Sequence, residues 1–101
     1  MAAYLIVDIA AVHDEAAYAE YRNRVTPGLE AAGGRYLVRG GPLEVLEGDW
    51  HPRRLVVVRF DSVQQAKTWW ASADYEPLRR QRAGATTTHM VIVEGLGEAG
   101  A

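Results

Sequence analysis

Arg39 stands at the end of an apolar stretch and directly before a pair of glycines. A guanidinium matches a carboxylate or an enolate through two parallel hydrogen bonds, and glycines let another group approach the backbone closely. Arg39 is therefore a candidate for binding an organic anion. The same pattern also fits a structural ion pair of Arg39 with Glu47, Asp8 or Asp49, or a contact across a subunit interface.

Asp8 is the charged residue in the otherwise apolar run from Ala3 to Ile9. Burial without a partner raises the pKa of a carboxyl group, and a raised pKa suits general acid or base catalysis. We therefore take Asp8 as one candidate for proton transfer and Glu47 as the other. A salt bridge of Asp8 with Arg54 or Arg59, or an exposed place at a strand end, are the alternatives.

An acid, a large aromatic ring and an imidazole follow one another at Asp49, Trp50 and His51, in a segment expected to be a loop. Trp50 is expected either to close over a cavity and stack on an aromatic ligand or to pack on a neighbouring subunit. His51 either transfers protons or faces solvent. Trp69 and Tyr75 are further candidates for lining a cavity, and core packing is the simpler interpretation of both.

The sequence predicts no metal, haem or nucleotide cofactor. It has no cysteine, and its histidines, His13, His51 and His89, do not have the spacing of metal ligands. His89 is interpreted as a hydrogen-bonded group of the core or of an interface. Neither a nucleophile elbow nor a phosphate-binding glycine loop is present.

Composition places the chain among ordinary globular proteins. Of its 101 residues 49% are apolar and 24% are charged, and the formal net charge is −2. This balance argues against a nucleic-acid partner, so the basic run from Arg79 to Arg82 is interpreted as a solvated face. No apolar run approaches the ~20 residues that cross a bilayer, and no secretory signal is recognised, so we expect no membrane partner and a cytoplasmic location.

The pattern of apolar residues and breakers predicts alternating strands and helices. The first helix opens at Asp14, is kinked or restarted by Pro27 near Thr26, and ends at Gly33-Gly34. The second helix starts with a capping box at Ser62, and the third has a cap around Asp74 and Pro77 in its first turn. Strands are expected at 3–9, 35–39, 43–47, 54–60 and 86–94, and the third helix at about 75–82. This order is the ferredoxin-like βαββαβ arrangement of the α+β class, with an antiparallel sheet.

Helical periodicity predicts which side chains of the helices enter the core. The stripe of the first helix consists of Tyr18, Tyr21, Val25 and Leu29. The stripe of the second helix is expected to consist of Val63, Ala66, Trp70 and Ala73, with Trp69 beside it. We expect residues 1–95 to form a single domain and residues 96–101 to form a frayed tail.

The strands themselves predict a homodimer. Residues 55–58 and 90–93 are continuously apolar, whereas an antiparallel sheet with one solvated face shows alternation. Two helices cover one face of a four-stranded sheet. The other face is therefore expected to be covered by the same face of a second copy.

Several spaced motifs together resemble one known family. They are Arg35-x-Leu37-x-Arg39-Gly40-Gly41, Glu47-Gly48-Asp49-Trp50-x-Pro52-x-Arg54, Phe60-Asp61-Ser62, Ala66-x-x-Trp69, Ser72-x-x-Tyr75 and Val93-Glu94-Gly95. The chain resembles the Domain of Unknown Function 1330 family of the dimeric α/β-barrel superfamily. The resemblance implies a ferredoxin-like protomer whose sheet pairs with that of a second copy into a barrel with a cavity.

Members of that superfamily include cofactor-free monooxygenases, cyclases, isomerases and small-molecule sensors, so the fold alone does not choose a function. The first hypothesis is a cofactor-independent enzyme acting on a small aromatic or enolisable organic acid. In this hypothesis Arg39 and Arg54 bind the anionic group. Asp8 or Glu47 transfers protons. The cavity wall consists of Trp50, Trp69 and Tyr75. The alternative is a non-catalytic small-molecule-binding or stress-related accessory protein, which a cavity filled by Trp and Tyr side chains would favour.

Overall fold

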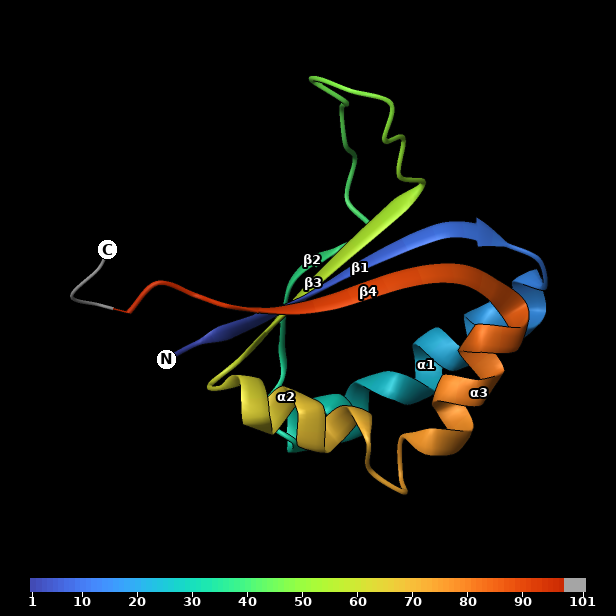
Figure 1. Ribbon diagram of the computed structural model, residues 1–101. Helices are drawn as coiled ribbons and strands as arrows, with labels where there is room; N and C mark the ends of the chain where they lie inside the picture. The colour runs from blue at the N-terminus through green and yellow to red at the C-terminus, as the bar shows by residue number, and fades with distance from the viewer. Residues whose placement is uncertain (98–101) are drawn as a thin grey trace.

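The computed structural model describes residues 1–97 and consists of one sheet with helices against one of its faces (Figure 1). The βαββαβ order is confirmed, with two helices between the third and fourth strands. The elements are β1 (Ala3–Val12), α1 (Glu15–Ala31), β2 (Arg35–Arg39), β3 (Arg54–Phe60), α2 (Val63–Trp70), α3 (Glu76–Ala85) and β4 (Thr86–Glu94).

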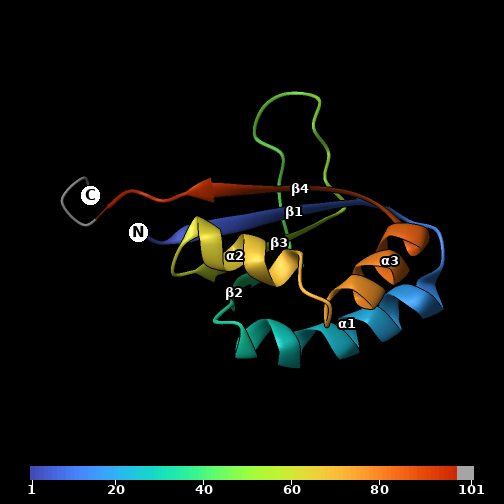
Figure 2. The ribbon, with the colours of Figure 1, turned by 60° about the horizontal axis from the view of Figure 1, so that its bottom comes forward.

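The four strands form an antiparallel sheet in the order β2-β3-β1-β4. β1 lies inside the sheet, with β3 on one side and β4 on the other, so β2 and β4 are the edge strands. All three helices lie on the same side of the sheet (Figure 2). The ferredoxin-like α+β fold predicted from the element order is therefore correct.

Alternation along β1 separates two faces of the sheet. Ala3, Leu5, Val7 and Ile9 are buried beneath the helices, and the residues between them are only partly buried. Because successive side chains of a strand point to opposite faces, the residues between them, Asp8 included, lie on the face without helices. We call the side toward the helices the inner face and the other side the outer face.

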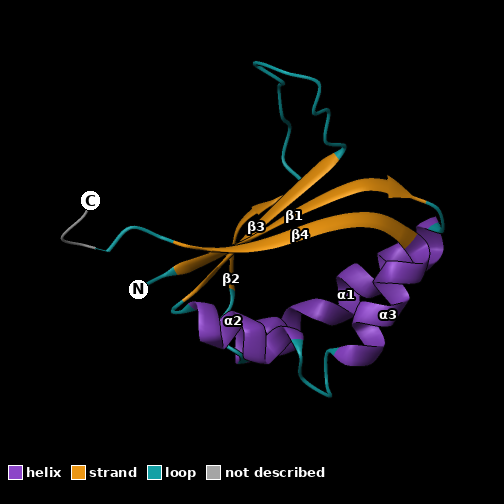
Figure 3. Ribbon diagram, in the orientation of Figure 1, coloured by secondary structure: helices purple, strands orange, loops and turns teal. Residues whose placement is uncertain are grey.

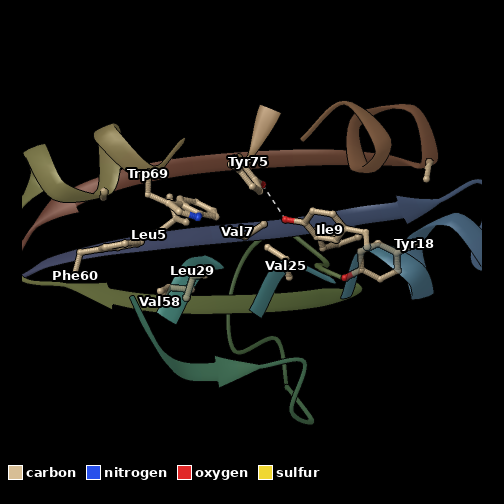
Figure 4. Packing of buried hydrophobic residues seen from close by; sticks show 13 residues of the cluster. Leu5, Val7, Ile9, Tyr18, Val25, Leu29, Val58, Phe60, Trp69 and Tyr75 are labelled. Atoms are coloured by element: carbon tan, nitrogen blue, oxygen red, sulfur yellow. Dashed lines mark hydrogen bonds between the residues drawn. The ribbon is translucent and has the colours of Figure 1, made fainter. Parts of the chain in front are cut away.

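The stripe predicted for α1 enters the core as expected. Tyr18, Tyr21, Val25 and Leu29 are buried and belong to the core cluster. Figure 4 shows Tyr18, Val25 and Leu29 among the packed side chains. Asp14 caps the helix by accepting a hydrogen bond from the backbone N–H of Ala17 at 3.0 Å. The helix runs without interruption from Glu15 to Ala31 with Pro27 inside it, so the predicted kink does not end or restart it.

The stripe predicted for α2 is wrong at its second half. Trp69 is the buried residue, with 6% of its surface exposed, whereas Trp70 is 41% exposed and Ala73 is exposed. α2 ends at Trp70, so its inward side has one full turn, on which Ala66 and Trp69 lie three residues apart. The Trp69 ring packs on Phe60 and Tyr75, at centroid distances of 5.8 and 4.0 Å.

The ends of the other helical segments follow the prediction in part. Ser62 caps α2 as expected, accepting a hydrogen bond from the Gln65 backbone N–H at 3.0 Å. α3 has Pro77 in its first turn but has no side-chain cap, so Asp74 does not cap it. The helix also continues past Arg82 to Ala85, where β4 follows directly.

The strand predicted at 43–47 is not present. Residues 41–53 have no regular structure and form an arm that projects beyond the sheet (Figures 1 and 3). Pro42 interrupts the strand pattern, and β3, the partner of β2, begins only at Arg54. Leu46, in the arm, is 93% exposed. Of the tail predicted at 96–101, residues 98–101 lie outside the described part of the chain.

We expect the two neighbouring tryptophans to differ sharply in their contribution to stability. Trp69→Ala leaves a cavity between Phe60 and Tyr75 and should lower the free energy of unfolding by about 3–5 kcal/mol. Trp70→Ala removes a partly exposed ring that stacks on Arg79 at 4.2 Å and should cost about 1 kcal/mol. Urea unfolding of both variants measures the difference; equal losses would contradict the assignment of Trp69 to the core.

Candidate functional site

Arg39 and Arg54, predicted as ligand-binding residues, line one cavity in the structure. This inner cavity has a volume of about 40 Å³ and lies between the inner face of the sheet and α1. Val7, Tyr18, Tyr36 and Trp69 also line it. Trp69 is therefore at the cavity wall as predicted, while its ring is at the same time part of the packed core.

Positive charge collects around the inner cavity. Four arginines line it, namely Arg22, Arg39, Arg54 and Arg82, and no Asp or Glu of residues 1–97 is among its lining residues. None of the four forms a salt bridge with another residue of that range. An anion entering this space would therefore meet guanidinium groups that no described carboxylate neutralises.

Local contacts position Arg39 and Arg54. Arg39 donates a hydrogen bond from Nη2 to the backbone oxygen of Arg22 at 2.8 Å. A side chain at Gly40, where φ is +70°, would collide with the Arg54 guanidinium. The glycine at this position therefore leaves room for the guanidinium. The Nε atom of Arg54 is buried and has no hydrogen-bond partner within the described chain. The ion pairs considered for Arg39 with acidic residues do not form among residues 1–97.

Tyrosine rings lie against the same arginines. The Arg39 guanidinium lies 4.4 Å from the centroid of the Tyr36 ring, and that of Arg22 lies 5.3 Å from the centroid of Tyr18. Such stacking holds the planar guanidinium while leaving its N–H groups free for an anion. The cavity lining therefore combines aromatic rings with hydrogen-bond donors.

A buried pair of tyrosines lies deeper, beside Trp69. The hydroxyl groups of Tyr21 and Tyr75 share a hydrogen bond of 2.8 Å (dashed line in Figure 4). Burial raises the pKa of the Tyr21 phenol far above its ordinary value, and the neighbouring Tyr75 raises it further. Tyr21 therefore remains protonated at neutral pH and can donate a hydrogen bond, but it is not a base.

Asp8 and Trp50 meet on the outer face, away from the inner cavity. The indole Nε1 of Trp50 donates a hydrogen bond to Oδ2 of Asp8 at 2.8 Å. Oδ1 of Asp8 is buried without a partner among the described residues. The salt bridge considered for Asp8 with Arg54 or Arg59 does not form among residues 1–97, and Arg59 instead pairs with Asp61 at 3.0 Å.

The predicted site is thus divided between the two faces of the sheet. Arg39, Arg54 and Trp69 line the inner cavity, and Tyr75 packs beside Trp69. Asp8 and Trp50 lie on the outer face, and Glu47 is exposed on the arm. Within one chain the candidate proton-transfer carboxylates do not face the arginines that were expected to hold the substrate.

Sequence reasoning missed Arg22 and Arg82. Arg22 stands four residues after Tyr18 on α1, a spacing that places both on one helix face. Arg82 belongs to the basic run interpreted as a solvated face, and for this residue that interpretation is wrong, since it is 7% exposed. α3 turns Arg82 inward while Arg80 remains outside and pairs with Glu76 at 2.7 Å.

The described chain offers little for other classes of site. Among residues 1–97 no group of three or more acidic or histidine side chains is arranged to hold a metal ion. No helix in that range is long and apolar enough to cross a membrane. His51 and His89 are both exposed in the single chain.

Comparison with known proteins gives a family and a fold. Residues 2–96 match the profile of a family described as a domain of unknown function, DUF1330. A crystal structure of a protein of unknown function from Rhodopseudomonas palustris is 18% identical, with a TM-score of 0.78 over 95% of this chain and 83% of that one. Its methylated form is similar, at 16% identity and a TM-score of 0.78 over 96% of this chain and 82% of that one.

A further structure has the same fold with a larger deviation. It is a protein from Nitrosomonas europaea proposed to be an antibiotic biosynthesis monooxygenase, 16% identical, with a TM-score of 0.56 over 96% of this chain and 92% of that one. A search of curated proteins finds no match. Identities this low establish the shared ferredoxin-like fold and leave the chemistry open.

The raised pKa of Tyr21 predicts how stability changes at alkaline pH. Because the phenol is held protonated in the folded state, its contribution is complete below the unfolded pKa of about 10 and decreases as the pH rises above it. The free energy of unfolding should fall by up to about 1.4 kcal/mol per pH unit from this one group. Urea unfolding at pH 9 and pH 11 should show a smaller decrease for Tyr21→Phe than for the wild type. Tyr4→Phe removes a hydroxyl from the outer face as a control; an unchanged slope for Tyr21→Phe would contradict the assignment.

Proposed function

The chain belongs to the DUF1330 family, and on that premise we propose that it binds a small organic acid with an aromatic or apolar body. One observation carries the proposal: four arginines line the inner cavity, and no described carboxylate lines it with them. Guanidinium groups bind carboxylates through paired, charge-assisted hydrogen bonds. The anionic group of the ligand is assigned to Arg39 and Arg54.

The size of the inner cavity determines how such an acid would lie. About 40 Å³ accommodates a carboxylate group but not an aromatic body. The body would rest outside the cavity, against the half-buried ring of Tyr36, which already stacks on Arg39. This arrangement supports binding of the anionic end inside and of the ring outside.

Between a binding protein and an enzyme, the packing supports the binding protein. Trp69 and Tyr75 fill the interior, and the candidate bases, Asp8 and Glu47, lie away from the arginines. A second candidate function, a cofactor-independent enzyme, draws on the buried pair of Tyr21 and Tyr75. A protonated phenol beside a bound enolisable acid could stabilise an enolate oxygen by a hydrogen bond.

We further propose that two copies pair through the outer faces of their sheets. Ile6 and Val57 lie side by side there, and Val91 and Val93 are 58% and 47% exposed in the single chain. Covering these side chains with the same face of a second copy would remove apolar surface from water. It would also enclose the hydrogen-bonded pair of Asp8 and Trp50, so this part of the predicted site would belong to the dimer.

The anion-binding proposal predicts weaker binding of a simple aromatic acid when the arginines are removed. Benzoate is the probe, and calorimetric titration gives its affinity. Arg39→Gln and Arg54→Gln should each weaken binding about tenfold, because each removes a charge-assisted pair. Arg24→Gln, at an exposed arginine of α1 that pairs with Glu20, is the matched control. Equal affinities in all three variants, or no binding to the wild type, would reject the proposal.

The pairing proposal predicts the mass of the protein in solution. Size-exclusion chromatography with light scattering should give the mass of two chains for the wild type. Val91→Glu places a charge among the apolar side chains of the outer face, on β4, and should shift the mass to that of one chain. Ala73→Glu adds the same charge at an exposed position away from this face and should leave the two-chain mass unchanged. A wild type with the mass of one chain would refute the pairing.

A further inference from the structure

A long groove runs between α2 and the edge strand β4, on the opposite edge of the sheet from Arg39. Its volume is about 970 Å³, at the upper end of the roughly 300–1,000 Å³ typical of ligand pockets. Its walls are mainly apolar, with Ala66 and Ala71 on the α2 side and Met90 and Ile92 on the β4 side. The groove is therefore large enough for a ligand that the inner cavity does not accommodate.

Arg82 supplies a cationic group to this groove. Its residue surface is 7% exposed, and its Nε atom is buried without a hydrogen-bond partner among residues 1–97. No carboxylate of that range forms a salt bridge with it, and the contact seen is with the ring of Tyr21, 5.9 Å from the guanidinium carbon. A buried cation without an opposite charge is unfavourable, and the negative end of α3, whose last turn holds Arg82, offsets only part of this cost.

Other polar groups also line the groove, and among them Ser72 and Thr88 are half-buried. Gln64, Lys67 and Thr68 line it and are exposed on α2. Trp70 also lines the groove; it is partly exposed, and its ring stacks on Arg79. The groove thus combines a buried positive charge, an apolar wall and a polar rim.

We infer that the groove between α2 and β4 is a second ligand site, for a monocarboxylic acid with a flexible apolar chain. The carboxylate pairs with the Arg82 guanidinium and gives that buried cation the opposite charge it lacks within the described chain. The apolar chain of the ligand lies along Met90 and Ile92, where its burial contributes about 0.8 kcal/mol per methylene group. This site goes beyond the proposed function, because it uses a different cavity at the other edge of the sheet. Arg82 also lines the inner cavity, but the proposed function assigns the anionic group there to Arg39 and Arg54.

The test is calorimetric titration with octanoate, compared with 1-octanol, which has the same chain without the charge. Wild type should bind octanoate at least about tenfold more tightly than 1-octanol, the difference that a charge-assisted pair produces. Arg82→Gln should remove that preference. Arg80→Gln, on the exposed side of the same helix, is the matched control and should keep it.

A second pair of variants tests the groove without changing its charge. Ala71→Phe projects a ring into the groove and should weaken octanoate binding about tenfold or more. Ala73→Phe adds the same ring at an exposed position that does not line the groove. If circular dichroism shows that Arg82→Gln is unfolded, the octanoate affinities of Ala71→Phe and Ala73→Phe test the site instead. No octanoate binding to the wild type, or equal affinity in Ala71→Phe and Ala73→Phe, would overturn the assignment. Benzoate binding and its dependence on Arg39 are read separately, so either site can fail alone.

Discussion

The register of β1 within the sheet determines how the rest of the molecule is arranged. Leu5, Val7 and Ile9 pack beneath the helices, and the residues between them face outward. Because the side-chain period of a strand is two, shifting β1 by one residue would bring Asp8 into the core and turn Val7 outward. The apolar core, the inner cavity and the chemistry of each face all follow from this one alternation.

The inner face joins an aromatic core to a set of positive charges. Tyr21, Trp69 and Tyr75 pack together beneath β1, and arginines surround the remaining space. A folded chain ordinarily pairs its buried charges, since an unpaired one is costly. Here the carboxylates that pair with arginines, such as those of Glu20, Asp61 and Glu76, lie on the surface. Of the arginines at the inner cavity, Arg82 is buried and Arg54 is half-buried, whereas Arg22 and Arg39 are exposed. The positive charge therefore extends from the core to the surface, where the proposed acidic ligand would complement it.

The two hollows on either side of the core differ in the ligand they fit. The inner cavity near β2 is small and has four arginines and three tyrosines among its otherwise apolar lining, which suits the anionic end of a compact acid. The groove beside β4 is larger and mainly apolar, with one buried arginine. Both hollows are lined by Leu5, Arg82 and Met90. A change in the packing of these side chains would therefore alter the shape of both hollows.

Local patterns in the sequence were sufficient for the element order, the α1 stripe, the cap at Ser62 and the family motifs, because these depend on residues close together in the chain. They also identified Arg39 and Arg54 as a pair. The tertiary structure decided which tryptophan is buried, because α2 stops at Trp70, and left residues 43–47 without a strand, because no partner strand reaches them. It also buried Arg82 and separated Asp8 from the arginines. The length of a helix, the pairing of strands and the side of an element that turns toward the core depend on contacts between distant segments. Those contacts form only when the chain folds.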